Sequence, residues 1–357
     1  MIRRTIVPLA LALIALGSGG CATTRNVAGE PSPKEGGAAP TETALTPAEA
    51  APGQPAPADA GPAGAPAAAP RPAPAAMGFI PSGKPEIVAR VERLQFPAWI
   101  ERGGIRASVK AGWAIYTSDR LFTGPEGRIE LGVAGEGRLK IGGDSDVEIT
   151  EAYQFTGGGV EPSLLTVHRG SFYFKSPMVR TGTAGTLLVV GDAINANVLG
   201  GRLFGRVDSE EAMIALEDAV VHVSGPKLNP GTMREKGTFL RVPRVGKAQP
   251  VTGAPGDRMA RWLSQAETVV GRPSLSAEGT WDVSLNSGYS VKQLEEMACR
   301  IQRRGFPTEI YPVKEPGKLT WYRVVVRRFA TKGDAVNFMN TAKGLGSKEP
   351  WVLVPQS

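Results

Sequence analysis

The sequence predicts a multidomain protein in which an all-β domain precedes a smaller α+β domain. Short apolar–polar alternations broken by glycine fill residues 86–245, as is typical of β-sandwiches, barrels and short solenoids. Residues 279–357 switch between strand-like and helix-like periodicity in the order βαββαβ. Residues 21–80 consist mainly of Ala, Pro and Gly, so they bury too little apolar surface to offset the entropy of ordering. We therefore expect a disordered tether before the folded domains.

Residues 1–20 have the features of an export signal. MIRR supplies a cationic start, TIVPLALALIALG forms a short apolar run, and SGG precedes Cys21. This pattern resembles a bacterial lipoprotein signal, which implies cleavage before Cys21 and acylation of its thiol. Ala22 follows the cysteine instead of Asp, and by the same resemblance this favours a periplasmic protein anchored to the outer membrane. A plain secretory signal is the alternative, because Ser18 stands where the lipoprotein pattern prefers Leu.

The all-β domain contains a motif that occurs again in a looser form. Residues 119–131 read DRLFTGPEGRIEL, RLKIG follows at 138–142, and LGGRLF at 199–204 is the looser version. These residues resemble the FecR-type periplasmic domain, which implies an all-β module for protein interaction. The family's name-giving members signal to a sigma factor through a cytoplasmic amino-terminal domain. We find no such domain here, so we expect residues 86–245 to bind an envelope or divisome protein instead.

Residues 246–278 are predicted to link the two domains. Within them, DRMARWLSQAETVV at 257–270 has the pattern of a short amphipathic helix, with four apolar residues on one face: Met259, Leu263, Ala266 and Val270. Trp262 and Leu263 would be exposed if this helix stood alone, so we expect it to pack on a neighbour.

The final domain is predicted to form an antiparallel sheet with both helices on one face. Its strands are expected at 281–286, 308–313, 319–329 and 351–354, and its helices at 291–305 and 331–346. Successive residues of a strand point to opposite faces. This alternation places under the helices Tyr322, Val324 and Val326, together with Val283 and Leu285. The open side then carries Trp321, Arg323, Val325 and Arg327, beside Ser284.

An exposed Trp flanked by Arg on a flat sheet suits a sugar chain. Apolar sugar faces stack on an aromatic ring, and the sugar hydroxyl groups take hydrogen bonds from side chains. The alternative is that Trp321 only fixes the end of a strand. Trp-x-Arg-Val at 321–324, with Phe329 and Ala335, resembles the SPOR domain family. The resemblance implies a ferredoxin-like βαββαβ fold that binds peptidoglycan glycan strands lacking stem peptides, often at the division septum.

Strand alternation and the resemblance together give five candidate glycan-binding residues: Ser284, Ser287, Trp321, Arg323 and Arg327. Ser287 matches a serine of the family pattern. Ser284 stands where the family usually has Gln, and Arg327-Arg328 replaces Gly-Pro. Removal of a stem peptide leaves a free lactyl carboxylate on every second sugar, an anion that Arg323 and Arg327 can meet with charge-assisted hydrogen bonds.

The formal net charge of +7 is concentrated in the final domain, where twelve Lys and Arg face seven Asp and Glu from residue 279 onward. RNA-recognition domains share the βαββαβ order, so a basic sheet of this kind also suggests a nucleic-acid partner. The third strand, however, offers one Trp and two Arg on its open side instead of the Gly/aromatic core of that motif. An exported chain is also separated from nucleic acid, so we expect no such partner.

No segment has the pattern of an enzyme. Neither His168 nor His222 has a second ligand at metal-binding spacing, and the sequence lacks the Gly-x-Ser-x-Gly, P-loop and His-Glu-x-x-His motifs. Asp144-Ser145-Asp146 lies in a glycine-flanked turn, where Asp and Ser typically cap their own backbone. We predict a non-catalytic protein that needs neither cofactor nor metal.

Two functional hypotheses follow. In the first, the protein is a periplasmic lipoprotein of the outer membrane whose final domain binds peptidoglycan under remodelling, while residues 86–245 engage a partner. In the second, residues 86–245 are the working sensor or scaffold, and the final domain only positions them.

Overall fold

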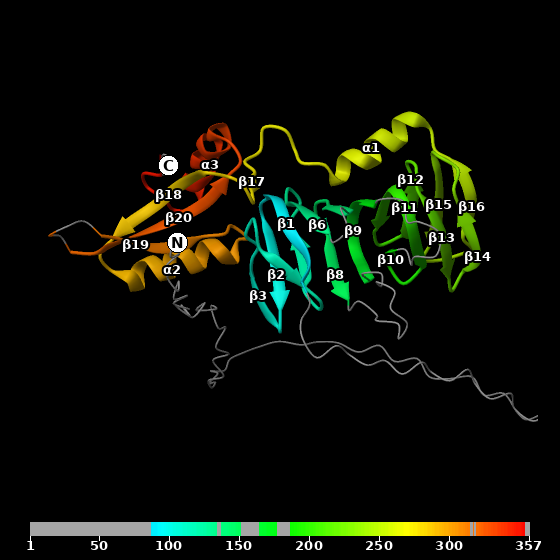
Figure 1. The fold of residues 1–357 in the computed structure, drawn as a ribbon, viewed down its shortest axis with the longest axis horizontal. Coiled ribbons are helices and arrows are strands. Elements are labelled where there is room, and N and C mark those ends of the chain that lie inside the picture. Colours follow the sequence, from blue (N-terminus) through cyan, green and yellow to red (C-terminus); the bar gives the residue numbers. More distant parts are fainter. Residues whose placement is uncertain are drawn as a thin grey trace, which may run out of the picture. The chain divides into compact units, whose positions relative to one another are not determined.

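The computed structural model describes residues 87–133, 137–150, 164–176, 186–314, 317 and 319–353 (Figure 1). The predicted export signal, Cys21 and the predicted tether lie outside these residues. The described chain contains a β-module (β1–β16, residues 87–253) and a carboxy-terminal domain (β18–β21 with α2 and α3, residues 281–353). Helix α1 (Gly256–Ala266) and the short strand β17 (Leu275–Ser276) lie between them in the sequence.

The strands of the β-module form two layers. They are β1 (Ile87–Gln95), β2 (Ala98–Arg102), β3 (Ile105–Ser108), β4 (Ala114–Tyr116), β5 (Arg120–Thr123), β6 (Arg128–Val133), β7 (Gly137–Ile141), β8 (Asp146–Thr150), β9 (Leu164–Ser176), β10 (Thr186–Val190), β11 (Ile194–Val207), β12 (Glu211–Leu216), β13 (Val220–Gly225), β14 (Leu228–Met233), β15 (Thr238–Pro243) and β16 (Gln249–Gly253). One layer has the order β1-β6-β7-β9-β11-β12-β15-β16. The other has the order β3-β2-β5-β8-β9-β10-β11-β13-β14.

Two long strands connect the layers. β9 leaves the second layer at Arg169 and enters the first at Gly170, and β11 makes the same change at Gly200–Gly201. Along β6 and β7, buried residues alternate with more exposed ones. The inner faces therefore share one core, whose largest fully buried side chains include Phe172, Phe174 and Leu131.

Helix α1 covers the outer face of the first layer. All six residues of β12 are buried, because one side of the strand faces the main core and the other faces this helix. Trp262 of α1 is buried with Met213 of β12, and its ring lies 6.4 Å from the Phe204 ring and parallel to it, and 5.3 Å from the Phe239 ring. The prediction that this helix packs on a neighbour through Trp262 is confirmed.

The predicted helix over 257–270 is too long. The chain turns extended at Glu267, and Val270 is 99% exposed instead of lying on the packed face. The buried side chain of Gln95 binds the backbone here: its amide donates to Val269 O over 2.9 Å and accepts from Val269 N over 2.8 Å. These bonds satisfy backbone groups that a longer helix would have paired internally.

The carboxy-terminal domain is a four-stranded antiparallel sheet with two helices. Its elements are β18 (Trp281–Gly288), α2 (Val291–Arg303), β19 (Glu309–Val313), β20 (Trp321–Phe329), α3 (Lys332–Gly344) and β21 (Trp351–Leu353). The strand order is β19-β20-β18-β21. Both helices pack on the side of the sheet that carries Val283, Val324 and Val326, all fully buried. We call the opposite side of this sheet the open face.

The two parts of the described chain are joined by more than a linker. Leu275 of β17 pairs with Leu94 of β1 and with Phe329 of β20, so the first layer of the β-module continues into the carboxy-terminal sheet. Phe96 of the β-module packs against the rings of Phe306 and Phe338, with centroids 5.1 and 5.3 Å apart. The segment predicted to link the domains is therefore largely built into the fold, since β16, α1 and β17 all lie within it.

Gly305 lies just after the end of α2, where this helix meets the β-module. Its N–H donates to Gln302 O, and the next N–H donates to Ile301 O, the two bonds of a helix-ending Schellman turn. The turn requires a positive φ, which is +82° here. A Cβ on Gly305 would lie 2.7–2.8 Å from atoms of Pro97 and Trp99, so the β-module approaches the helix end closely.

Candidate functional site

A β-bulge in β18 decides which side chains reach the open face. Strict alternation would place Ser284 and Ser287 on opposite faces, because they are three residues apart. The register of β18 shifts between Ser284 and Asn286, so Ser284 lies opposite Val325 and Ser287 lies opposite Arg323. Directly opposed residues share a face. The bulge therefore turns Asn286 toward α2 and brings both predicted serines to the open face.

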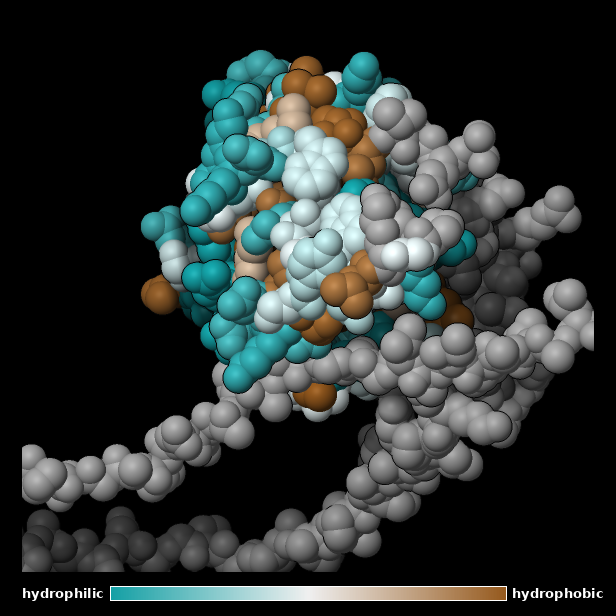
Figure 2. Space-filling view, turned by 90° about the vertical axis from the view of Figure 1, so that its left-hand side faces the viewer, coloured by the Kyte–Doolittle hydropathy of each residue, from teal (hydrophilic) through white to brown (hydrophobic). Residues whose placement is uncertain are grey.

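Two rows of side chains cross the open face. The first row contains Tyr311, Arg323 and Ser287 from β19, β20 and β18. The second row contains Glu309, Val325, Ser284 and Trp351 from all four strands. Trp321 and Arg327 extend this face along β20. Viewed from the end with the β19–β20 hairpin, the domain shows pale aromatic rings among hydrophilic and hydrophobic side chains (Figure 2).

Arg323 lies at the centre of an aromatic cluster. Its guanidinium carbon is 4.7 Å from the ring centroid of Trp321, 5.5 Å from that of Trp351 and 6.0 Å from that of Tyr311. One guanidinium N–H donates to the Tyr311 hydroxyl over 3.3 Å. Its Nε is buried without a partner, and among the described residues no carboxylate lies within ion-pair distance of Arg323. Within the described part of the chain, the positive charge is therefore held by aromatic rings and not by an acidic partner.

Arg327, by contrast, is already engaged by acidic neighbours. Its Nε lies 2.9 Å from Asp282 Oδ2 and its Nη1 lies 3.8 Å from Glu309 Oε2. The hydrogen bond to Asp282 raises the pKa of Arg327 above its usual range. Asp282 also accepts the backbone N–H of Arg328. Arg327 is half exposed, but a ligand anion has to compete with these two carboxylates for it.

Ser284 and Val325 lie on the open face but are fully buried. The Ser284 hydroxyl has no hydrogen-bond partner in the described part of the chain. A ligand can reach it only if neighbouring side chains move. Ser287 is half-buried and stands directly opposite Arg323, so it is the better placed of the two predicted serines.

A groove of about 700 Å³ runs along one end of the open face. The residues that line it are Ala277, Glu278, Gly279, Thr280, Asp282, Tyr311, Arg323, Arg327, Arg328 and Leu353. The groove thus combines one aromatic ring with three arginines and two carboxylates, Glu278 and Asp282. The excess of arginines favours an anionic ligand over a neutral one.

Tyr311 and Trp351 belong to this site although the predicted site residues do not include them. Both come from strands whose pairing partner depends on register, and register is not visible in a strand's own sequence. Alternation within EIYPV places Glu309, Tyr311 and Val313 on one side without saying which side that is. The one signal in the sequence was for Trp351, since WVLV begins with an aromatic residue at a strand end.

The polar groups singled out in the β-module have structural partners. Ser145 is buried and donates to Gly142 O over 3.0 Å, and Asp146 forms a two-bond ion pair with Arg120 at 2.7 and 2.6 Å. His168 contacts Glu148 at 3.0 Å, and His222 contacts the Thr232 hydroxyl at 2.7 Å. In the Asp144–Asp146 turn, Ser145 therefore bonds the local backbone as expected, and Asp146 pairs with an arginine side chain instead.

The family of the carboxy-terminal domain follows from comparison with known families. A family described as the SPOR domain matches residues 277–353. Residues 277–353 form a SPOR domain. SPOR domains as a family bind peptidoglycan and are non-catalytic binding domains. The open face described above belongs to this SPOR domain, and the match does not extend to the β-module.

No curated protein matches the sequence. Two crystal structures described as an anti-sigma factor from Parabacteroides distasonis, at 1.65 and 2.50 Å resolution, match the chain at low similarity. Each is 12% identical, with TM-scores of 0.33 and 0.34. The first similarity covers 40% of this chain and 64% of that one, and the second covers 63% of this chain and 91% of that one.

None of the three helices in the described part of the chain has the length and apolar character that crossing a bilayer requires.

Proposed function

We propose that this protein is a non-catalytic lipoprotein of the cell envelope whose SPOR domain binds glycan strands that lack stem peptides. The observation that carries the proposal is the Arg323 guanidinium, surrounded by the rings of Trp321, Tyr311 and Trp351 on the open face. A glycan strand of this kind offers both an apolar sugar face for a ring and a free carboxylate for a guanidinium.

The carboxylate explains selectivity for strands without peptides. When a stem peptide is attached, the lactyl group is an amide and carries no charge. After amidase cleavage, the same group is a carboxylate. Arg323 therefore gains a charge-assisted hydrogen bond only with the cleaved strand, and such bonds are stronger than neutral ones. A bulky peptide on the sugar would also have to fit over a face lined by rings.

Each predicted site residue has a distinct role in this proposal. Trp321 stacks on a sugar ring, Arg323 binds the carboxylate, and Ser287 donates to a sugar hydroxyl beside Arg323. Arg327 acts at the edge of the face, where Asp282 and Glu309 weaken its contribution. Ser284 lies below the surface and supports the site without a direct contact.

The remaining parts of the proposal rest on the sequence signals. Acylation of Cys21 would anchor the protein to the outer membrane from the periplasmic side, and the Ala/Pro/Gly-rich residues 21–80 would let the folded part reach the cell wall. The β-module would act as a FecR-like interaction module for another envelope or divisome protein. Glycan without stem peptides occurs where the wall is remodelled, so we place the protein at the septum or at similar sites.

Binding to purified sacculi tests the central claim. The full chain from residue 22, which lacks the lipid, is mixed with intact or amidase-treated sacculi and the bound fraction is measured. We expect binding to treated sacculi only, and Trp321→Ala should lower it by roughly tenfold. Val336→Ala, a partly exposed apolar position on α3, is the control and should bind as the wild type does. Equal binding by Trp321→Ala removes Trp321 from the site, and equal binding to intact sacculi contradicts the proposed selectivity.

A further inference from the structure

The open face of the SPOR domain is continued by a turn of the β-module. This turn, residues 110–113, connects β3 to β4 and is fixed to β1. The N–H of Gly112 donates to Val91 O over 2.7 Å, and Val91 N–H donates back to Trp113 O over 2.9 Å. The turn is thus part of the β-module framework and has a defined position beside the end of β20.

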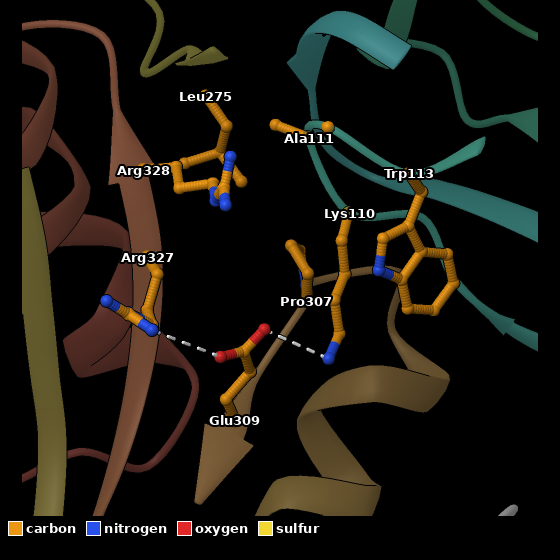
Figure 3. A pocket seen from close by; sticks show the side chains of 9 residues that line it. Lys110, Ala111, Trp113, Leu275, Pro307, Glu309, Arg327 and Arg328 are labelled. Atoms are coloured by element: carbon orange, nitrogen blue, oxygen red, sulfur yellow. Dashed lines mark hydrogen bonds and ion pairs between the residues drawn. The ribbon is translucent and has the colours of Figure 1, made fainter. Parts of the chain in front are cut away.

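One carboxylate connects the turn to the SPOR domain. Lys110 Nζ donates to Glu309 Oε1 over 3.1 Å, and Glu309 Oε2 lies 3.8 Å from Arg327 Nη1 (Figure 3). Because Glu309 belongs to the second row of the open face, this contact places Lys110 at the border of the proposed glycan site. A cation of the β-module and a cation of the SPOR domain therefore share a single counter-charge.

A cavity of about 110 Å³ lies between the turn and the SPOR domain. Side chains from both parts line it, among them Lys110, Trp113, Glu309, Arg327 and Arg328. Arg327 and Arg328 also line the 700 Å³ groove on the open face. The groove and the cavity therefore adjoin at this pair of arginines.

The cavity repeats the chemistry of the open face. Lys110 Nζ lies 5.2 Å from the centre of the Trp113 ring, just as the Arg323 guanidinium lies 4.7 Å from the Trp321 ring. Trp113 is half-buried, so part of its indole remains accessible. Three cations line the cavity, and the carboxylates that contact them are Glu309 of the lining and Asp282, which pairs with Arg327. The remaining positive charge favours an anionic ligand.

The side chain of Arg328 lies close to Gly112 of the turn. Arg328 Nη1 donates to Ala277 O over 2.5 Å, which fixes the guanidinium beside the turn. A Cβ on Gly112 would lie 2.9 Å from the same nitrogen, and φ at Gly112 is +83°. The positive φ favours glycine at this position, and a side chain here would displace the end of Arg328 from the turn.

We propose that the glycan site extends from the open face onto the Lys110–Trp113 turn. A strand that crosses Arg327 and Arg328 stacks a second sugar on Trp113 and presents a second carboxylate to Lys110, in exchange for Glu309. This inference rests on the proposed function and names an additional subsite for the same ligand class, an acidic amino-sugar polymer. It gives the β-module a direct part in recognising that polymer.

Ligand length provides the test. The six steps from Trp321 to Arg327 span about 20 Å at about 3.3 Å per residue. Fragments of denuded glycan shorter than this occupy the open face alone, and longer strands reach the turn. Affinities of the full chain from residue 22 are measured by calorimetry with both. We expect Trp113→Ala to weaken binding of long strands by roughly threefold to tenfold and to leave the short fragments unaffected.

Lys110→Gln is the second variant, because Trp113 also packs on the core and its loss can disturb the fold. The Lys110–Glu309 pair is partly exposed, so its removal changes stability little. We expect the same length-dependent loss. If both variants bind long strands as tightly as the wild type, or weaken both lengths equally, the extended site is wrong. A wild-type protein that binds neither length contradicts the proposed function itself.

Discussion

The guanidinium group of Arg323 lies 4.7 Å from the centre of the Trp321 ring, two residues away on the same face of β20. Trp351 of β21 and Tyr311 of β19 approach the same group from the two edge strands of the sheet. The rings hold the cation in place without neutralising it, which distinguishes Arg323 from the ion-paired Arg327. This difference between two arginines of one strand leads to the first two predictions.

Arg323→Ala should lower the affinity for denuded glycan by roughly tenfold to hundredfold, since it removes a charge-assisted hydrogen bond. Arg323→Lys keeps the charge but loses the planar fork, so it should recover only part of the affinity. Calorimetry with soluble fragments measures both. Arg300→Ala, an exposed position on α2, is the charge-matched control. A loss as large with Arg300→Ala would show that net charge, and not the site, determines binding.

Arg327→Ala should have a smaller effect, about threefold or less, because Asp282 and Glu309 already compensate its charge. The same titration measures it beside Arg323→Ala. If Arg327→Ala proves as damaging as Arg323→Ala, the carboxylate of the ligand is bound at the other end of the groove from the one we assign.

Trp351→Ala should weaken glycan binding by roughly threefold to tenfold, because it removes one ring next to Arg323. Trp351 is 37% exposed, so the free energy of unfolding should fall by about 1 kcal/mol or less. Urea unfolding of the variant separates the two effects. An unchanged affinity would restrict the binding platform to Trp321 and Tyr311.

Gly305→Ala should destabilise the junction between the β-module and the SPOR domain. Its Cβ would overlap Pro97 and Trp99, and φ is +82°. Gly317→Ala is the matched control, because Gly317 has a φ of +75° and a Cβ added there would meet no atom within 4 Å. Gly317→Ala should lower the free energy of unfolding by the backbone strain alone, about 1–2 kcal/mol. Gly305→Ala should lower it by more. If both variants lose the same free energy of unfolding, Pro97 and Trp99 can move away from the added Cβ at no cost.

The SPOR domain cut out as residues 279–357 should be less stable than the same domain in the full chain. It loses the pairing of Leu275 with Phe329 and the contacts of Phe96 with Phe306 and Phe338. Thermal unfolding compares this fragment with one that begins at residue 86. A fragment of 279–357 that melts at the same temperature as the longer chain would contradict a shared core.

Much of the SPOR domain was predictable because its local patterns are strong. Alternation in WYRVVVRRF correctly separated Val324 and Val326 from Trp321 and Arg323, since a strand's two faces differ in burial. The βαββαβ order followed from the same periodicities. The pairing of Ser287 with Arg323 could not be derived from strict alternation, because it depends on a bulge that one extra residue inserts.

The features that sequence patterns could not supply are contacts between distant segments. No local pattern around Phe96 and Pro97 predicts that they contact the end of α2. Likewise, no residue near Arg327 in the sequence indicates that Asp282 pairs with it. Lys110 and Glu309 are far apart in the chain, and only the fold brings them to 3.1 Å. The helix over 257–266 was visible, but its end was not, because the backbone beyond it at Val269 is bonded by Gln95 from another strand.

The two-residue strand β17 has a mechanical consequence. Leu275 is hydrogen-bonded into a strand on each side, to β1 and to β20, so it acts as a seam between two sheets. A displacement of the SPOR domain relative to the β-module therefore has to break the pairing of Leu275 with Leu94 or with Phe329 first.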